Sequence, residues 1–197
     1  MIAATHWPRA TREAYRAAER AAEHKSEYID GFVLAMTGAS RAHNVIAGNV
    51  SAALNVQLAE SPCEVYVADM RVKVSYTGDH TYPDVVVACG DIAFEDAELD
   101  TLLNPAVIVE VLSPSTEGYD RGTKFEIYRR IASLQEYIMV AHDRVLVEHY
   151  VRHEEGWHYI SYDAPDQSPH LPSIACTLPL NDIYRKVRFP SVHPPRR

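Results

Sequence analysis

The chain has 197 residues, of which 47% are hydrophobic and 23% are charged, and its formal net charge is −8 at pH 7. These values predict one globular domain with a sizeable core, over residues 9–188. They exclude a membrane protein, because no apolar run reaches the roughly 18 residues of a transmembrane helix. The negative charge excludes a broad basic surface for nucleic acid, so such a contact has to be local. Residues 1–8 are expected to form an N-terminal arm, and the Pro- and Arg-rich residues 189–197 a disordered tail.

The three cysteines, Cys63, Cys89 and Cys176, lie far apart and form no Cys-x-x-Cys pair. This spacing argues against a disulfide framework or a zinc cluster, and it predicts that Cys89 and Cys176 are buried thiols. The N-terminus lacks the charged start and the long apolar core of a signal peptide. We therefore expect a protein of the reducing cytoplasm.

The first third of the chain predicts a helix, a β-hairpin and a second helix. Residues 9–25 are rich in alanine, which favours a surface helix. An Asp-Gly pair divides two short strand patterns within residues 27–36, as in a hairpin. Ser40 is a suitable N-cap for a helix that extends to about residue 59, in which every fourth residue from Ile46 to Leu58 is apolar.

The rest of the chain predicts mainly strands. The acidic residues around Glu95 to Asp100 indicate a solvated loop. The order of elements predicts an α/β fold with a mixed β-sheet core flanked by helices, an N-terminal hairpin and a C-terminal β extension. The expected strands are 64–67, 71–76, 82–87, 106–112, 137–140, 144–151 and 157–162, and the expected helices are 119–132 and 181–186.

Two of these strand patterns are short apolar runs that carry one carboxylate each. The run 82–87 carries Asp84, and the run 106–112 carries Glu110. A buried carboxylate is costly unless something compensates its charge. Two of them on neighbouring strands could hold a divalent cation between them. An equally good interpretation of these two runs places Asp84 in a Pro-Asp turn and pairs Glu110 with a basic residue.

Three further polar residues, Asp120, Lys124 and Tyr128, follow one another at helical spacing and share one side of the expected helix. Asp120 and Lys124 could be an ordinary helical salt pair, or Lys124 could point at the two carboxylates. His43, in the first turn of its helix, is more often a surface or capping residue than a catalytic one. Glu27 is most simply an exposed charge at a strand edge.

Taken together, Pro83-Asp84, a glutamate in the next strand and a lysine in the following helix resemble the PD-(D/E)xK nuclease superfamily. Within it, the chain is most similar to the Uma-two family of predicted restriction endonucleases, over about residues 10–188. The run from Glu110 to Thr116, with Asp120 and Lys124 after it, is the most specific part. One departure is Leu112, since the superfamily pattern has a lysine two residues after the strand acid. The position that matches the displaced lysine is Lys124, and Lys73 is a weaker substitute.

The resemblance implies a restriction-endonuclease-like fold and Mg²⁺-dependent hydrolysis of DNA by a homodimer, with Mn²⁺ able to replace Mg²⁺. Asp84 and Glu110 would hold the metal, and Lys124 would orient the attacking water or stabilise the transition state. One alternative is a non-catalytic nucleic-acid-binding or regulatory protein that retains the fold. Another is hydrolysis of a different phosphate ester. The supporting residues are Glu27, His43, Tyr128, Lys73 and Asp120, of which Asp120 is the one most readily explained as structural.

Overall fold

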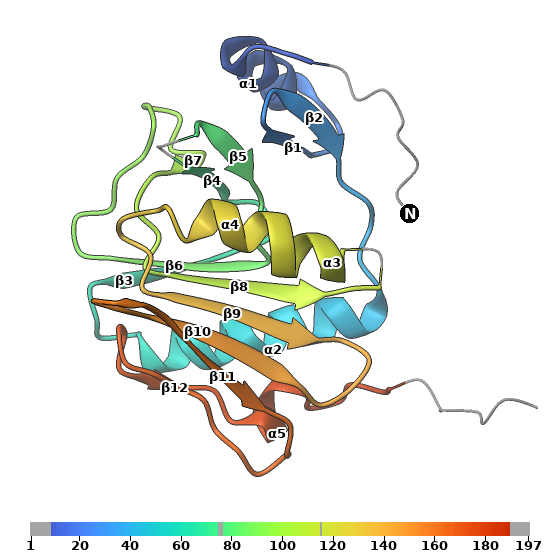
Figure 1. The fold of residues 1–197 in the computed structure, drawn as a ribbon, viewed down its shortest axis with the longest axis vertical. Coiled ribbons are helices and arrows are strands. Elements are labelled where there is room, and N and C mark those ends of the chain that lie inside the picture. Colours follow the sequence, from blue (N-terminus) through green and yellow to red (C-terminus); the bar gives the residue numbers. More distant parts are fainter. Residues whose placement is uncertain (1–8, 75–76, 115, 190–197) are drawn as a thin grey trace, which may run out of the picture.

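The computed structural model describes residues 9–74, 77–114 and 116–189, so the expected arm 1–8 and residues 190–197 of the expected tail lie outside the described part. Two large β-sheets, a small two-stranded sheet and the helices around them make up this part of the chain (Figure 1). None of its helices is both long and apolar enough to span a membrane.

The central sheet has six strands in the order β11-β10-β9-β8-β6-β3. β8 and β9 run parallel, and the other neighbouring strands run antiparallel. The strands are β3 (Cys63–Val67), β6 (Val85–Cys89), β8 (Val107–Leu112), β9 (Glu136–Ala141), β10 (Val147–His153) and β11 (Gly156–Tyr162).

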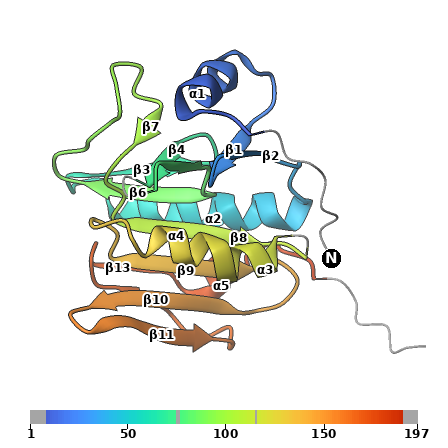
Figure 2. The same ribbon diagram turned by 45° about the horizontal axis from the view of Figure 1, so that its top comes forward.

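Helices cover both faces of this sheet, with α2 behind the strands and α3 and α4 in front of them (Figure 2). On the far side, α2 and the short α5 share an apolar core with the odd-numbered residues of β8. On the near side, α3, a π-helical turn η1 and α4 form one continuous helical segment. The bounds are α2 (Arg41–Gln57), α3 (Glu117–Tyr119), η1 (Asp120–Lys124), α4 (Phe125–Tyr128) and α5 (Leu180–Ile183).

The alternation along β8 decides where its carboxylate points. Val109 and Val111 pack in the core under α2, whereas Ile108 and Leu112 pack in the core under α4. Because successive strand residues point to opposite faces, Glu110 faces the same side as Ile108 and Leu112. This register directs Glu110 toward the helical segment that contains Lys124.

A second sheet of five strands, in the order β2-β1-β5-β4-β7, lies beside the helical segment and carries the N-terminal hairpin. Tyr15 of α1 anchors this hairpin, because its hydroxyl donates to the carbonyl of Ser26 at 2.6 Å. The elements are α1 (Arg12–Ala21), β1 (Ser26–Ile29), β2 (Phe32–Ala35), β4 (Arg71–Val74), β5 (Asp79–Thr81) and β7 (Thr101–Leu102), and a separate two-stranded sheet pairs β12 (His170–Leu171) with β13 (Cys176–Thr177).

Most of the expected elements are confirmed, and the helix after β8 differs most. The hairpin pairs across Asp30-Gly31, and the Ser40 hydroxyl accepts the N–H of His43 at the start of α2. The helix expected over 119–132 instead covers 117–128 and contains the π-helical turn. A π-turn inserts one residue into the helical repeat, a feature that hydrophobic spacing does not reveal.

The prediction of a buried thiol is wrong for Cys89, and so is the expectation of no disulfide. Cys63 of β3 and Cys89 of β6 are cross-strand partners and form a disulfide. Their pairing depends on the antiparallel register of β3 and β6, which brings together two cysteines 26 residues apart and cannot be deduced from cysteine spacing. Cys176 is buried and free, as expected. The cysteines therefore give no argument for a reducing compartment.

The acidic segment between β6 and β8 is only in part the solvated loop that its composition indicated: Glu98 is exposed, but its neighbours form ion pairs. Glu95 is only 11% exposed and pairs with Lys73 and Arg16. Asp100 accepts hydrogen bonds from Arg20 of α1 and forms an ion pair with Arg71 at 2.9 Å. Arg71, at the start of β4, is 2% exposed. The acidic residues thus compensate buried and helical arginines.

Replacing Asp100 with Asn should destabilise the protein by about 1–3 kcal/mol, because it leaves the buried guanidinium of Arg71 without a carboxylate. Hydrogen bonds from Arg20 hold the pKa of Asp100 below its usual range. A depressed pKa contributes stability that is present at neutral pH and is lost on acidification. The difference in the free energy of urea unfolding between the wild type and Asp100→Asn should therefore be largest at neutral pH, as at pH 7, and should shrink below about pH 4.

The matched control is Asp182→Asn, which removes an exposed carboxylate that lies 3.9 Å from Arg185. Surface ion pairs of this kind contribute about 0–1 kcal/mol. Equal destabilisation by both variants would contradict a structural role for the Asp100–Arg71 pair.

Candidate functional site

The candidate site lies where β1, the start of β6, β8 and the helical segment 117–128 meet. Its centre is the buried ion pair between Glu110, 4% exposed, and Lys124, 5% exposed. The Lys124 Nζ lies 2.9 Å from Oε1 of Glu110. The Tyr128 hydroxyl donates to the same oxygen at 2.9 Å and lies 3.0 Å from Oγ1 of Thr81.

Asp84 is held next to Glu110 by the backbone of β8. The Val111 N–H donates to Oδ2 of Asp84 at 2.7 Å, and Nε2 of His43 lies 2.7 Å from Oδ1. His43 comes from the first turn of α2, and its side chain and that of Asp84 are 16% and 20% exposed. These two residues therefore form the solvent-facing edge of the site.

Glu27 reaches the site from β1 and is 5% exposed, so the interpretation as an exposed edge charge is wrong. Its Oε1 lies 3.2 Å from Lys124 Nζ and accepts the N–H of Tyr82 at 3.2 Å. Its Oε2 accepts the hydroxyl of Tyr119 at 3.0 Å. The N-terminal hairpin thus supplies a second buried carboxylate to the same lysine.

Asp120 adds a fourth carboxylate, 3% exposed, whose Oδ1 lies 3.6 Å from Lys124 Nζ. Its backbone carbonyl accepts the hydroxyl of Tyr137 from β9 at 3.1 Å. Asp120, Lys124 and Tyr128 do share one side of the helical segment, as their spacing predicted. The salt pair and the lysine aimed at the carboxylates prove to be parts of one cluster.

The charges of this cluster do not balance, because the ammonium of Lys124 faces three carboxylates, those of Glu27, Glu110 and Asp120. Burial raises the pKa of Glu110 well above its usual range, and Asp120 and Asp84 add to that rise. Burial also raises the pKa of Asp120. Burial alone would lower the pKa of Lys124, but Glu110 and Glu27 raise it well above its usual range, so the lysine is charged. A further positive charge near these carboxylates would therefore be favoured electrostatically.

The oxygen atoms of Glu110 and Asp84 are the ligand type that a hydrated divalent cation would need, although the described residues form no cage of protein ligands. Among the described residues, no three His, Cys, Asp or Glu side chains are arranged to hold a metal. Mg²⁺, however, keeps several waters and binds through one or two carboxylates. In the described part of the chain no hydrogen bond reaches Oε2 of Glu110, and the carboxylate of Asp84 lies beside it and partly exposed.

Lys73, the weaker substitute for the missing lysine, does not belong to this cluster. It lies on β4 and pairs with Glu95. Leu112, the position where the superfamily pattern has its lysine, is 2% exposed and packs in the core under α4. The cation that reaches Glu110 therefore comes from the helix.

Sequence reasoning missed Tyr119, which contacts both Glu27 and Lys124. Its hydroxyl binds Glu27, and Lys124 Nζ lies 5.6 Å from the centre of its ring. The one available signal was its place five residues before Lys124, and only the π-helical turn makes that spacing meaningful.

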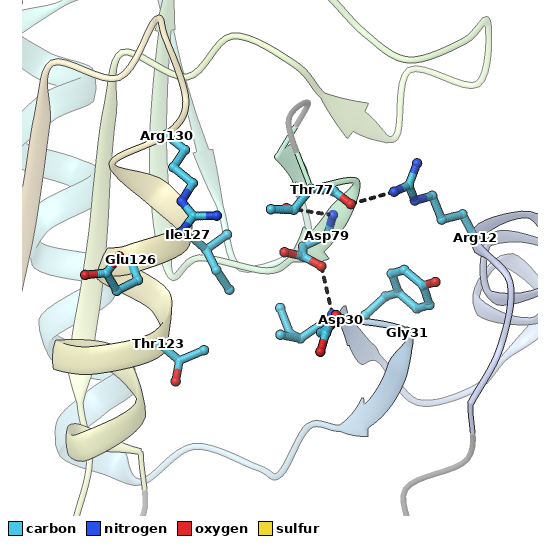
Figure 3. Close-up of a pocket in the computed structure, with 11 residues that line it drawn as sticks. Arg12, Asp30, Gly31, Thr77, Asp79, Thr123, Glu126, Ile127 and Arg130 are labelled. Carbon is cyan, nitrogen blue, oxygen red and sulfur yellow. Dashed lines mark hydrogen bonds between the residues drawn. The ribbon is translucent and has the colours of Figure 1, made fainter.

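A cavity of about 500 Å³ lies near the cluster, between the hairpin, the turn before β5, α1 and α4 (Figure 3). Ile29 and Ile127 line it, and Arg12, Asp79 and Arg130 place charges of both signs around it. The four carboxylates described above and Lys124 do not line this cavity.

Comparison with known proteins identifies the family of the chain and proteins that are similar to it in sequence and fold. A family described as "Uma2: Putative restriction endonuclease" matches residues 12–181. Two proteins of Synechocystis sp. (strain ATCC 27184 / PCC 6803 / Kazusa) are similar, both named as uncharacterized. One, slr1290, is 35% identical over 93% of this chain and 95% of its own length, and the other, sll1609, is 37% identical over 71% and 79%.

A crystal structure from Anabaena variabilis ATCC 29413, described as "a putative nuclease belonging to DUF820", shares the fold. Its TM-score is 0.74 at 18% sequence identity, with 89% of this chain and 97% of that chain covered. The mixed sheet with helices on both faces is therefore a restriction-endonuclease-like α/β fold, as the sequence predicted.

Removal of the Tyr128 hydroxyl should destabilise the protein by about 1–3 kcal/mol, because the buried Oε1 of Glu110 loses one of its two donors. Urea unfolding of Tyr128→Phe measures this loss. Tyr66→Phe is the control, since the Tyr66 hydroxyl donates to the exposed Glu64. A loss no larger than that of the control would show that Tyr128 does not support the ion pair.

Proposed function

Because the chain belongs to the Uma2 family, we propose that it is a metal-dependent endonuclease that hydrolyses the phosphodiester bonds of DNA. The observation that carries this proposal is the site itself: one buried lysine among three buried carboxylates, with an acidic, partly exposed edge at Asp84. A core stabilised by ion pairs alone has no need for more buried carboxylates than cations.

The side chains divide the work according to their contacts. Asp84 and Glu110 would hold Mg²⁺ or Mn²⁺, which when bound activates water and neutralises charge on the scissile phosphate. Lys124 provides a fixed positive charge beside Glu110, where it can orient the attacking water or stabilise the phosphorane-like transition state. Tyr128 holds Glu110, and His43 holds Asp84 at the edge that substrate reaches.

A homodimer is part of this proposal, because two copies of one site are needed to cut both strands of a duplex. The support for it is the superfamily resemblance. The net charge of −8 means that DNA has to be drawn to a local surface, and bound metal at the acidic edge would reduce the repulsion there.

The competing function is a nucleic-acid-binding or regulatory protein that retains this fold without cutting. The net charge and the replacement of the strand lysine by Leu112 both favour it. It differs from the nuclease in one respect that can be measured: it predicts binding without any metal-dependent cleavage.

The test is nicking of supercoiled and single-stranded DNA with Mg²⁺ or Mn²⁺, by the wild type and by Asp84→Ala, Lys124→Ala and Lys73→Ala. We expect the first two substitutions to lower the rate by at least roughly 100-fold, since each removes charge at the reacting phosphate. Lys73→Ala is the control and should cut at the wild-type rate, because Lys73 pairs with Glu95.

Thermal melts establish that each variant is folded before its rate is compared. Wild-type protein that cuts neither substrate with either metal would rule out the nuclease. If such protein still binds DNA, the non-catalytic function is the better description. If Lys73→Ala loses cutting while Lys124→Ala stays active, the catalytic lysine would be Lys73 of β4 and not Lys124.

A further inference from the structure

A short chain of contacts leads from α3 through the N-terminal hairpin to Lys124. The Tyr119 hydroxyl donates to Glu27 at 3.0 Å, and Glu27 in turn lies 3.2 Å from Lys124 Nζ. We infer that Glu27 and Tyr119 are positioning residues for the ammonium of Lys124, so that the hairpin β1–β2 completes the site. The effect of these residues on catalysis rests on the proposed nuclease function, whereas their contacts with Lys124 do not.

Glu27 has the contacts of a positioning residue rather than of a metal ligand. Its Oε1 is shared between the backbone N–H of Tyr82 and Lys124, and its Oε2 accepts the hydroxyl of Tyr119. Both oxygens therefore face protein donors. Glu110 differs, because both of its protein donors bind the single oxygen Oε1.

Tyr119 fixes Glu27 and Lys124 at the same time. Its hydroxyl binds the carboxylate, while its ring lies 5.6 Å from the ammonium, within the range of a cation–π interaction. Burial raises the pKa of Tyr119, so the hydroxyl keeps the proton that it donates. Removing the hydroxyl alone should loosen Glu27 and leave the ring contact in place.

A fixed ammonium matters because lysine has a long and flexible side chain. Carboxylates on three sides, from Glu27, Glu110 and Asp120, restrict Nζ to one position before any substrate binds. A charge that is already in place at the reacting phosphate needs no reorganisation during the reaction. Without Glu27, Lys124 would still contact Glu110 but could tilt away from it.

The experiment compares Tyr119→Phe and Glu27→Gln with the wild type by three measurements. These are the ¹⁵N NMR signal of the Lys124 ammonium, the dissociation constant for Mn²⁺, and kcat and KM for nicking. The Lys124 signal is assigned by its loss in Lys124→Arg. Tyr15→Phe is the matched control, because it removes another buried tyrosine hydroxyl, which binds β1 at Ser26, one residue before Glu27.

We expect the Lys124 signal to shift or broaden in both test variants and to stay unchanged in Tyr15→Phe. The Mn²⁺ dissociation constant should stay at the wild-type value in all three variants. In the test variants kcat should fall roughly 10- to 100-fold with KM nearly unchanged, since displacing a catalytic group by about 1 Å has an effect of this size.

Two results would overturn the inference. A Lys124 signal that is unchanged in both test variants would mean that Glu27 and Tyr119 do not position it. A Mn²⁺ dissociation constant that rises tenfold or more in Glu27→Gln would make Glu27 a metal ligand instead. If the wild type cuts no DNA, the nuclease function fails, while the NMR and Mn²⁺ measurements still decide whether the two residues position Lys124.

Discussion

The interaction on which the site depends is the buried contact of Lys124 with Glu110. Burying either charge alone would cost several kcal/mol, so each requires the other. This requirement fixes the distance between β8 and the helical segment 117–128, and with it the packing of the core under α4. Tyr128 and Thr81 extend the same contact to the five-stranded sheet. The proposed catalytic groups and the contacts that join β8, the helical segment and the five-stranded sheet are thus the same set of atoms.

Placing three carboxylates around one lysine requires elements from three parts of the chain. β1 brings Glu27, β8 brings Glu110, and the helical segment brings Asp120. The turn before β6 adds Asp84, which pairs with His43. The two β-sheets have to approach each other for these groups to meet, and the Tyr128 hydroxyl spans them by contacting Glu110 of β8 and Thr81 of β5. The arrangement leaves more carboxylates than ammonium groups around Lys124.

The local parts of the structure could be predicted from the sequence, and the long-range pairings could not. Asp30-Gly31 and Ser40 identify a turn and a helix cap because their chemistry acts within a few residues. Asp120, Lys124 and Tyr128 share a helix side for the same reason. The Cys63–Cys89 disulfide and the burial of Arg71 instead depend on partners 26 and 29 residues away, and no local pattern carries that information.

The displaced lysine follows from the same geometry. In β8, residues 110 and 112 point to one face, so a lysine two positions after Glu110 would lie beside it on the strand. Here Leu112 occupies that place and packs under α4. Lys124 reaches the same face from the helical segment that packs on it, and its ammonium comes within 2.9 Å of Glu110. What has to be kept is the position of the positive charge relative to Glu110, and the fold allows either the strand or the helix to supply it. The helix adds a further feature, because Tyr128 and Tyr119 of the same segment bind two of the three carboxylates that hold the lysine.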